Sequence, residues 1–219
     1  MTGITKDELA AMSVEFTLNG RAVVAEPNET IIQTAKRHGV EIPHLCYKEG
    51  MRPDGNCRAC MVEVKGERVL AAACCRKPAP GMDVTTDNAR ALHSQKMVLE
   101  LLLSDMPEKR HTLHSELDEW AAALKLGKPR FASRHNPPPD LSHYGIAVNL
   151  DSCIQCTRCV RACREEQVND VIGYAYRGEH SKVVFDLDDP MGGSTCVACG
   201  ECVQACQPGR SCPRATWGS

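Results

Sequence analysis

The chain has 219 residues, which is enough for two small domains or three modules, and its 26 basic and 28 acidic residues leave it close to charge balance. This balance argues against a nucleic-acid or polyanion partner. Only 3 Phe, 2 Trp and 4 Tyr accompany 14 cysteines, so the apolar core is expected to be thin and the cysteines to compensate for it.

Targeting and membrane segments are not expected. Residues 1–12 form a predicted N-terminal tail that contains acidic residues and no apolar region of the kind found in secretory signals. The longest apolar stretches, Val69–Cys75 and Val98–Leu103, are too short to span a bilayer. We therefore expect a cytoplasmic protein without a membrane span, in which thiols stay reduced and available to metal.

A β-grasp domain is predicted for residues 13–87. Asn19-Gly20 is a strong two-residue hairpin turn, and Gly39 is a typical stop for a helix. The predicted elements are strands at Ser13–Leu18 and Arg21–Ala25, a helix at Thr30–His38, a hairpin of Cys60–Lys65 with Arg68–Ala73, and a strand at Met82–Thr85.

Cysteines in this domain form a candidate 2Fe–2S site. The set is Cys46, Cys57, Cys60 and either Cys74 or Cys75. The loop between the first and third of these is rich in Gly, Pro, Asp and Asn, which turn the backbone tightly and expose amides that can bond to cluster sulfurs. A four-thiolate zinc site and reduced core cysteines are the alternatives.

A helical connector with a Pro-rich linker is predicted for residues 88–140. A helix should run from Asn88 to Ser104, with Asp87 as its N-cap and Met97 and Leu101 on its inward face. A second, shorter helix is expected at Ser115–Leu126. Ser115 would cap it with Asp118 in the capping box, Gly127 would stop it, and Lys128–Tyr144 would follow as a linker.

Two cysteine runs in residues 141–219 share the spacing C-x2-C-x2-C-x3-C and lie 43 residues apart. This spacing is typical of bacterial two-cluster ferredoxins, in which the fourth cysteine of each run ligates the other cluster. We expect that fourth cysteine to lie at the start of a helix. The predicted ligands are Cys153, Cys156, Cys159 and Cys206 for one 4Fe–4S cluster, and Cys163, Cys196, Cys199 and Cys202 for the other.

The remaining elements of this domain are a strand at Ile146–Leu150 and a hairpin of Val171–Tyr176 with Lys182–Leu187. The tail after Cys206 shows no pattern, and Cys212 is expected to be a thiol without a ligand role. The complete fold class is therefore α+β: a β-grasp 2Fe–2S ferredoxin-like domain, a short helical connector, and a bacterial ferredoxin-like domain with two 4Fe–4S clusters.

Three stretches, Ile42–Cys46, Gly55–Val64 and Ala73–Met82, resemble a known iron–sulfur region. It is the N-terminal region shared by the 75-kDa-type subunit of respiratory complex I, iron-only hydrogenases and the diaphorase side of NAD-linked hydrogenases. The resemblance is strongest to the alpha subunit of NAD-dependent molybdenum or tungsten formate dehydrogenases, through Cys74–Pro78 and Arg161–Gly173.

The resemblance also bears on individual ligands. The fourth 2Fe–2S ligand of that family usually lies seven residues before a glycine, and counting back from Gly81 selects Cys74; on a strand, Cys75 would point the other way. The family's third cluster, held by one histidine and three cysteines, should be absent. Its ligand positions hold Met106, Arg110, Leu113 and Glu119.

The expected function is electron transfer within a larger oxidoreductase. The resemblance implies partners: a flavin-bearing NADH subunit and a molybdenum or tungsten bis-pterin formate site, both outside this chain. No catalytic residue is predicted, because neither a dinucleotide fingerprint nor a Ser/His/Asp set is present. The alternatives are a small diaphorase subunit of an NAD-linked hydrogenase and a zinc-bound structural scaffold. The departure of the tail from the family pattern leaves open a truncated or frame-shifted alpha subunit.

Overall fold

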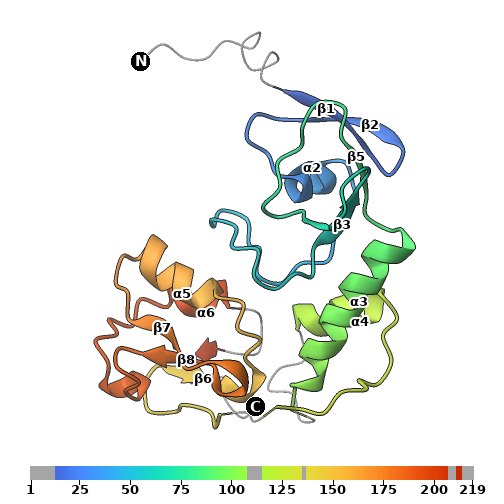
Figure 1. Ribbon diagram of the computed structural model, residues 1–219. Helices are drawn as coiled ribbons and strands as arrows, with labels where there is room; N and C mark the ends of the chain where they lie inside the picture. The colour runs from blue at the N-terminus through green and yellow to red at the C-terminus, as the bar shows by residue number, and fades with distance from the viewer. Residues whose placement is uncertain (1–12, 108–114, 135–136, 207–210, 214–219) are drawn as a thin grey trace, which may run out of the picture. The chain divides into compact units, whose positions relative to one another are not determined.

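The computed structural model describes residues 13–107, 115–134, 137–206 and 211–213, which fall into two compact units (Figure 1). The first unit contains residues 13–44 and 53–98; the second contains residues 45–52 and the described residues from 99 onward. The predicted α+β class is confirmed. The predictions for residues 1–12 and for Arg110 and Leu113 lie outside the described residues.

The first unit is a mixed sheet with helix α2 (Ile31–Arg37) beside it, followed by residues 89–98 of helix α3 (Ala89–Ser104) (Figure 1). Its elements are β1 (Val14–Leu18), β2 (Arg21–Ala25), α2 (Ile31–Arg37), β3 (Met61–Val64), β4 (Ala71–Ala72) and β5 (Asp83–Thr85). The strand order is β2-β1-β5-β3-β4, and the central β1–β5 pair is parallel while the others are antiparallel. This arrangement is the expected β-grasp sheet, and each predicted strand and helix of the domain is found within two or three residues of its expected ends.

Local sequence rules account for the start of this unit. Asn19 and Gly20 both have positive φ (49° and 76°), the conformation that a tight hairpin turn requires. Helix α2 begins after Thr30, whose backbone N–H donates to Gln33 Oε1 at 2.8 Å in a capping box. It ends at Arg37, and Gly39, with a φ of +74°, lies two residues further on as the C-terminal stop.

Helix α3 (Ala89–Ser104) corrects two predictions about its cap and its inward face. The N-cap is Asn88, whose Oδ1 accepts the backbone N–H of Ala91 at 2.9 Å, so the assignment to Asp87 was wrong. Leu101 was predicted to face inward but is 47% exposed.

Three buried positions of α3, Ala91, Gln95 and Leu99, are spaced four residues apart on one face, and Glu100 next to them is buried as well. Gln95 can be buried because its Nε2 donates to the carbonyls of Met61 (2.9 Å) and Thr86 (3.1 Å). A polar residue in the middle of the buried face hid that face from a hydrophobic pattern.

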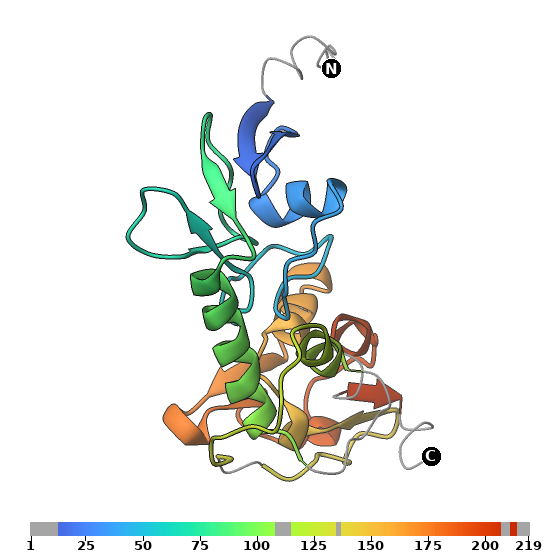
Figure 2. The ribbon, with the colours of Figure 1, turned by 90° about the vertical axis from the view of Figure 1, so that its right-hand side faces the viewer.

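The second unit contains short helices and strand pairs. Its elements are α4 (Glu116–Ala123), β6 (Ile146–Val148), α5 (Arg158–Arg161), a π-helical turn (Ala162–Glu166), β7 (Ile172–Ala175), β8 (Lys182–Phe185), α6 (Glu201–Ala205) and β9 (Ser211–Pro213), with 3-10 turns at Leu150–Ser152, Gly178–His180 and Met191–Gly193. The predicted β7–β8 hairpin is confirmed. Figures 1 and 2 both show α5 and α6 together on one side of that hairpin. None of the helices in the described residues combines the length and apolar character needed to cross a bilayer.

Helix α4 ends earlier than predicted. Lys125 has φ +54°, and the N–H of Leu126 donates to the Ala121 carbonyl at 2.8 Å, which closes the helix in a Schellman-type turn before Gly127. Ser115 occupies the N-cap position as expected, but it makes no side-chain cap hydrogen bond, so the predicted capping box is not formed.

The tail contains a strand that the sequence patterns did not predict. Residues Ser211–Pro213 of β9 pair antiparallel with Ile146–Val148 of β6. Three residues are too few to show a strand period, which explains the omission. The side chain of Cys212 lies outside the described residues.

The cap of α3 is testable with a matched pair of variants. Asn88→Ala removes the side chain that accepts the Ala91 N–H, and we expect a loss of about 1 kcal/mol. This corresponds to a melting temperature about 2–4 °C lower for a chain of this size. Asp87→Ala is the control and should leave the melting temperature unchanged. Differential scanning under anaerobic conditions measures both, and equal losses would contradict the assignment.

Candidate iron–sulfur cluster sites

The two cysteine loops of the second unit adopt the same backbone conformation. Gln155 (φ 57°) and Thr157 (φ 62°) are left-handed in the first loop. In the second loop, Ala198 (φ 58°) and Gly200 (φ 83°), each 43 residues further on, are left-handed as well. Left-handed φ values are uncommon for non-glycine residues, so their repetition at matching positions shows that the spacing dictates one loop geometry.

Each loop also makes the same bond from backbone to sulfur. The Gln155 N–H donates to Cys153 Sγ at 3.4 Å, and the Ala198 N–H donates to Cys196 Sγ at 3.4 Å. Left-handed residues among right-handed ones turn successive amides into a concave nest that favours anions, including those at iron–sulfur sites. The residues present therefore fit a group that is rich in sulfide and takes several thiolates.

The pKa values of two cysteines in this unit reflect burial and neighbouring thiols. The pKa of Cys159 is raised well above its usual value. Burial is the largest cause, and the neighbouring thiols follow in the order Cys206, Cys153, Cys156 and Cys202. Burial, followed by Cys196, Cys199 and Cys163, raises the pKa of Cys202 to about 12. The thiol of Cys206 is thus among the groups that act on Cys159, and the thiol of Cys163 is among those that act on Cys202. Their role as cluster ligands stays a prediction.

The prediction that the fourth cysteines lie at the start of a helix was wrong. Helices α5 and α6 begin at Arg158 and Glu201, before the third cysteine of each run. Cys163 therefore lies in the π-helical turn after α5, and Cys206 lies at the C-cap of α6. The reason is that the left-handed residues Thr157 and Gly200 are the N-caps of these helices.

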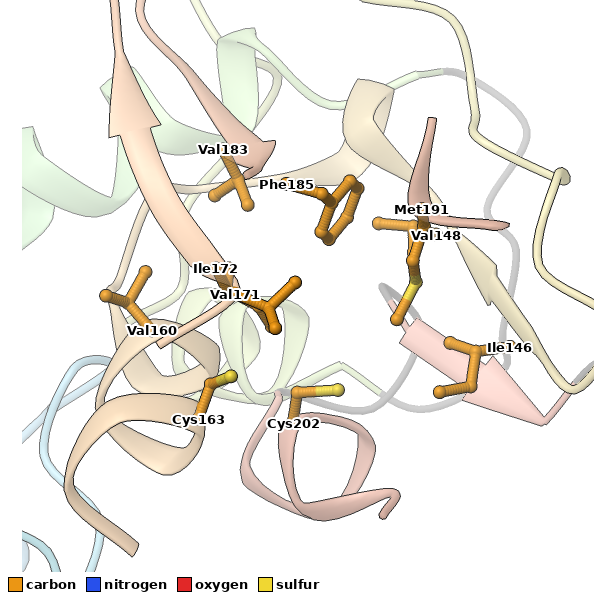
Figure 3. Packing of buried hydrophobic residues seen from close by; sticks show 10 residues of the cluster. All are labelled: Ile146, Val148, Val160, Cys163, Val171, Ile172, Val183, Phe185, Met191 and Cys202. Atoms are coloured by element: carbon orange, nitrogen blue, oxygen red, sulfur yellow. The ribbon is translucent and has the colours of Figure 1, made fainter. Parts of the chain in front are cut away.

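Apolar packing fixes two cysteines that are predicted to share the second 4Fe–4S cluster. Cys163 and Cys202 belong to the buried cluster of this unit, and Figure 3 shows them on neighbouring helical segments beside Val171 and Ile172 of the hairpin. The other members are Ile146, Val148, Val160, Val183, Phe185 and Met191. This small core fixes the cysteines on α6 and the π-helical turn relative to each other.

The two loops differ in exposure although their backbones match. In the first loop, Ile154 is 8% and Cys156 is 6% exposed. At the matching positions of the second loop, Val197 is 64% exposed and Cys199 is also exposed. The same sequence spacing therefore produces one covered and one open cysteine loop.

Three of the four candidate 2Fe–2S cysteines lie in the first unit. Cys57, Cys60 and Cys74 belong to the first, whereas Cys46 lies in the segment 45–52, which belongs to the second. Cys46, Cys60 and Cys74 are buried and Cys57 is half-buried. Their assignment to one cluster stays a prediction.

The strand argument used to choose between Cys74 and Cys75 was wrong. The two residues lie in a turn after β4, and their sulfurs are 3.6 Å apart instead of pointing to opposite faces. Cys74 is buried and Cys75 is exposed. A Cβ at position 55 would lie 2.7 Å from Cys75 Sγ. This close approach explains why residue 55 is a glycine. Cys74 remains the predicted ligand.

Single-ion sites are a separate matter. Within the described ranges, no three Cys, His, Asp or Glu side chains converge on a point that one metal ion could fill. An iron–sulfur cluster binds its thiolates at different iron atoms, so this finding does not bear on cluster binding.

Sequence reasoning missed two buried arginines beside the first loop, Arg158 and Arg161, each 3% exposed. The local sequence pattern around a charged residue does not mark it as buried. Comparison of the two cysteine runs could have singled out these arginines, because the matching positions of the second run hold Glu201 and Gln204.

Comparison with known proteins defines the class. Residues 11–89 match the family described as 2Fe-2S iron-sulfur cluster binding domain, and residues 152–209 match the 4Fe-4S dicluster domain. The chain is therefore an iron–sulfur electron-transfer module with a 2Fe–2S domain followed by a 4Fe–4S dicluster domain.

The relatives are larger proteins. A protein of Staphylococcus haemolyticus (strain JCSC1435) whose name is putative formate dehydrogenase is 31% identical over 83% of this chain and 19% of its own length. An NADH-quinone oxidoreductase subunit of Rickettsia bellii (strain RML369-C) is 29% identical over 81% of this chain and 27% of its own length. The chain thus spans about a fifth to a quarter of these relatives. The predicted resemblance to the iron–sulfur regions of formate dehydrogenases and complex I is confirmed.

A solved structure shares the fold. A chain in the crystal structure of an NAD+-reducing NiFe-hydrogenase in the H2-reduced state superposes with a TM-score of 0.85 at 24% identity. The match covers 94% of this chain and 89% of that one. The fold of this chain is therefore one already seen in a crystal structure.

Alanine variants distinguish the two neighbouring cysteines. Cys74→Ala should abolish the spin-resonance signal of the reduced 2Fe–2S cluster, because the cluster loses a thiolate ligand. Cys75→Ala is the matched control and should keep the signal at full intensity. The reverse pattern would assign the ligand to Cys75.

The left-handed N-caps provide a second pair of variants. Thr157 carries a β-branched side chain at φ 62°, a conformation that costs about 1–2 kcal/mol. Thr157→Gly removes this strain, while the greater freedom of glycine in the unfolded chain offsets about 0.5–1 kcal/mol. We expect a net gain of up to about 1 kcal/mol. A melting temperature below that of the wild type at equal iron content would contradict it.

Gly200→Ala provides the opposite change. No atom lies within 4 Å of a Cβ at this position, so the effect is conformational and not steric. We expect a loss of about 1 kcal/mol, read from the same anaerobic melting curves.

Proposed function

We propose that this chain is the iron–sulfur electron-transfer segment of an NAD-dependent formate dehydrogenase. It carries electrons between a molybdenum or tungsten pterin site that oxidises formate and a flavin-bearing NADH subunit, both outside this chain. The observation that supports the proposal is the pair of cysteine loops with left-handed residues and backbone-to-sulfur hydrogen bonds at matching positions.

The residues assigned to each group are those expected from the sequence. Cys46, Cys57, Cys60 and Cys74 would hold one 2Fe–2S cluster, and the two crossed sets of the second unit would hold two 4Fe–4S clusters. Bound clusters supply reversible one-electron transfer. The chain contributes thiolates, amides directed at sulfur and a covered environment, which are the levers that set reduction potential.

The assignment of electron transfer to this chain and of catalysis to its partners rests on the residues and the relatives together. We assign no catalytic residue to this chain, so formate chemistry and NADH chemistry belong to the partners. We also propose a cytoplasmic location and domains at residues 13–87 and 141–219 joined by a connector at 88–140. The relatives named as a formate dehydrogenase and as an NADH-quinone oxidoreductase subunit support a place within a multi-subunit oxidoreductase.

A second candidate is the small diaphorase iron–sulfur subunit of an NAD-linked hydrogenase. The fold, which a chain of an NAD+-reducing hydrogenase crystal structure shares over 89% of its length, accommodates that role equally well. The two candidates differ in the partner that supplies electrons: a molybdenum or tungsten pterin site for formate and a nickel–iron site for hydrogen.

Anaerobic purification of the chain with its native partners tests the proposal. The isolated chain should be brown and contain about ten iron atoms with acid-labile sulfide, as one 2Fe–2S and two 4Fe–4S clusters require. In the complex, formate should reduce these clusters and molybdenum or tungsten should co-purify. Reduction by hydrogen with co-purifying nickel would favour the hydrogenase subunit instead. A colourless chain with stoichiometric zinc and no labile sulfide would overturn both and indicate a structural scaffold.

A further inference from the structure

Two arginines on α5 are buried to a degree that is unusual for this residue. Arg158 and Arg161 are each 3% exposed, although charged side chains are almost never fully buried unless they are paired. The Nε atoms of both lie buried without a hydrogen-bond partner among the described residues. The burial of these two arginines therefore serves a purpose other than solubility.

Arg158 is paired with a carboxylate. Its Nη1 and Nη2 donate to the two carboxylate oxygens of Glu116 at 2.7 and 2.9 Å, and Nη2 also donates to the carbonyl of Tyr47. A guanidinium stays charged in proteins, so Arg158 places a positive charge directly before Cys159 of the first run.

Arg161 has no carboxylate partner in the described part of the chain. Its Nη1 donates to the carbonyl of Arg52, and its Nη2 donates to the carbonyl of Cys46. Its positive charge is thus met only by backbone dipoles, and one of these belongs to a candidate 2Fe–2S ligand.

The segment Leu45–Arg52 is held to the dicluster elements at further points. Lys48 Nζ donates to the carbonyl of Gln204 on α6. Arg52 forms an ion pair with Glu165 of the π-helical turn, with Nη2 and Oε1 2.7 Å apart. These outer contacts are exposed, so the two buried arginines are the stronger constraint.

The repeat shows that the arginines are not needed to form the loop. The second loop has the same backbone, but Glu201 and Gln204 stand where the first has Arg158 and Arg161. Because the backbone conformations match, the arginines relate to something that differs between the two loops. The first loop is covered, and its two arginines bind backbone carbonyls of the segment that carries Cys46. The second loop is open.

We propose that Arg158 and Arg161 are positioning residues with two effects: they fix the backbone of Cys46, and their buried charge favours the reduced form of the first 4Fe–4S cluster. The inference rests on the proposed cluster binding. Reduction adds a negative charge to a group that is already anionic, and a fixed cation in a low-dielectric site stabilises that form strongly.

Redox titration followed by spin resonance tests both effects on the purified full chain. In Arg161→Gln the ratio of reduced to oxidised first 4Fe–4S cluster at a fixed potential should fall about tenfold, equivalent to about 59 mV for a one-electron couple. Arg158→Gln should act in the same direction. The 2Fe–2S signal of Arg161→Gln should broaden or lose intensity, because the Cys46 carbonyl loses its donor.

Arg164→Gln is the matched control. Arg164 makes an exposed ion pair with Asp170, so this variant removes the same charge from the same segment. Its cluster signals and potentials should equal those of the wild type. Equal shifts in Arg164→Gln and Arg161→Gln would overturn the inference, because net charge alone would then explain them.

Arg161→Lys separates the two effects and covers the case in which Arg161→Gln does not assemble. It keeps the charge but cannot donate to both carbonyls in the planar geometry of arginine. The first 4Fe–4S potential should stay near the wild-type value while the 2Fe–2S signal changes. An unchanged 2Fe–2S signal would overturn the positioning role. A wild-type chain without iron and sulfide would instead overturn the proposed function itself.

Discussion

The constraint on which the structure depends is the crowding of eight cysteines into a unit with a small apolar core. Burial and neighbouring thiols raise the pKa of Cys159 and of Cys202, so a free thiolate is unfavourable at either position. Metal binding requires the deprotonated form and returns its binding free energy to folding. The loops, the β7–β8 hairpin and the short helices can therefore be read as a frame that holds thiols where iron would neutralise them. This accounts for a core that needs so few aromatic residues.

Much of this frame was predictable because its causes are local. The alternation of apolar residues and the Asn19-Gly20 turn define the first hairpin, and the buried Phe16 and Leu18 confirm its register. The cysteine spacing predicted two equivalent loops, and left-handed residues recur at matching positions of both. In both cases the neighbours that decide the structure lie a few residues away in the chain.

The errors arose where a choice between similar residues depended on distant contacts. Asp87 and Asn88 are both good N-caps, and Asn88, which caps α3, also bonds through its side-chain amide to Glu63 of β3. Leu99 and Leu101 both suit a helix, and the hydrogen bonds of Gln95 to Met61 and Thr86 decide which face is covered. Likewise, a turn in place of a strand places the sulfurs of Cys74 and Cys75 side by side. No pattern of propensities contains this information.

The two cysteine loops show how an internal duplication can yield unequal sites. Their backbones are alike, yet burial of the first loop alone makes an added negative charge there more costly than at the open second loop. Arg158 and Arg161 counter that penalty only at the first loop, and the second carries Glu201 and Gln204 at those positions. Exposure and fixed charge thus act in opposite directions at each loop. An electron carrier needs clusters whose reduction potentials are close enough for transfer in sequence. Opposing effects of exposure and fixed charge narrow the difference in reduction potential between the two clusters, which burial alone would widen.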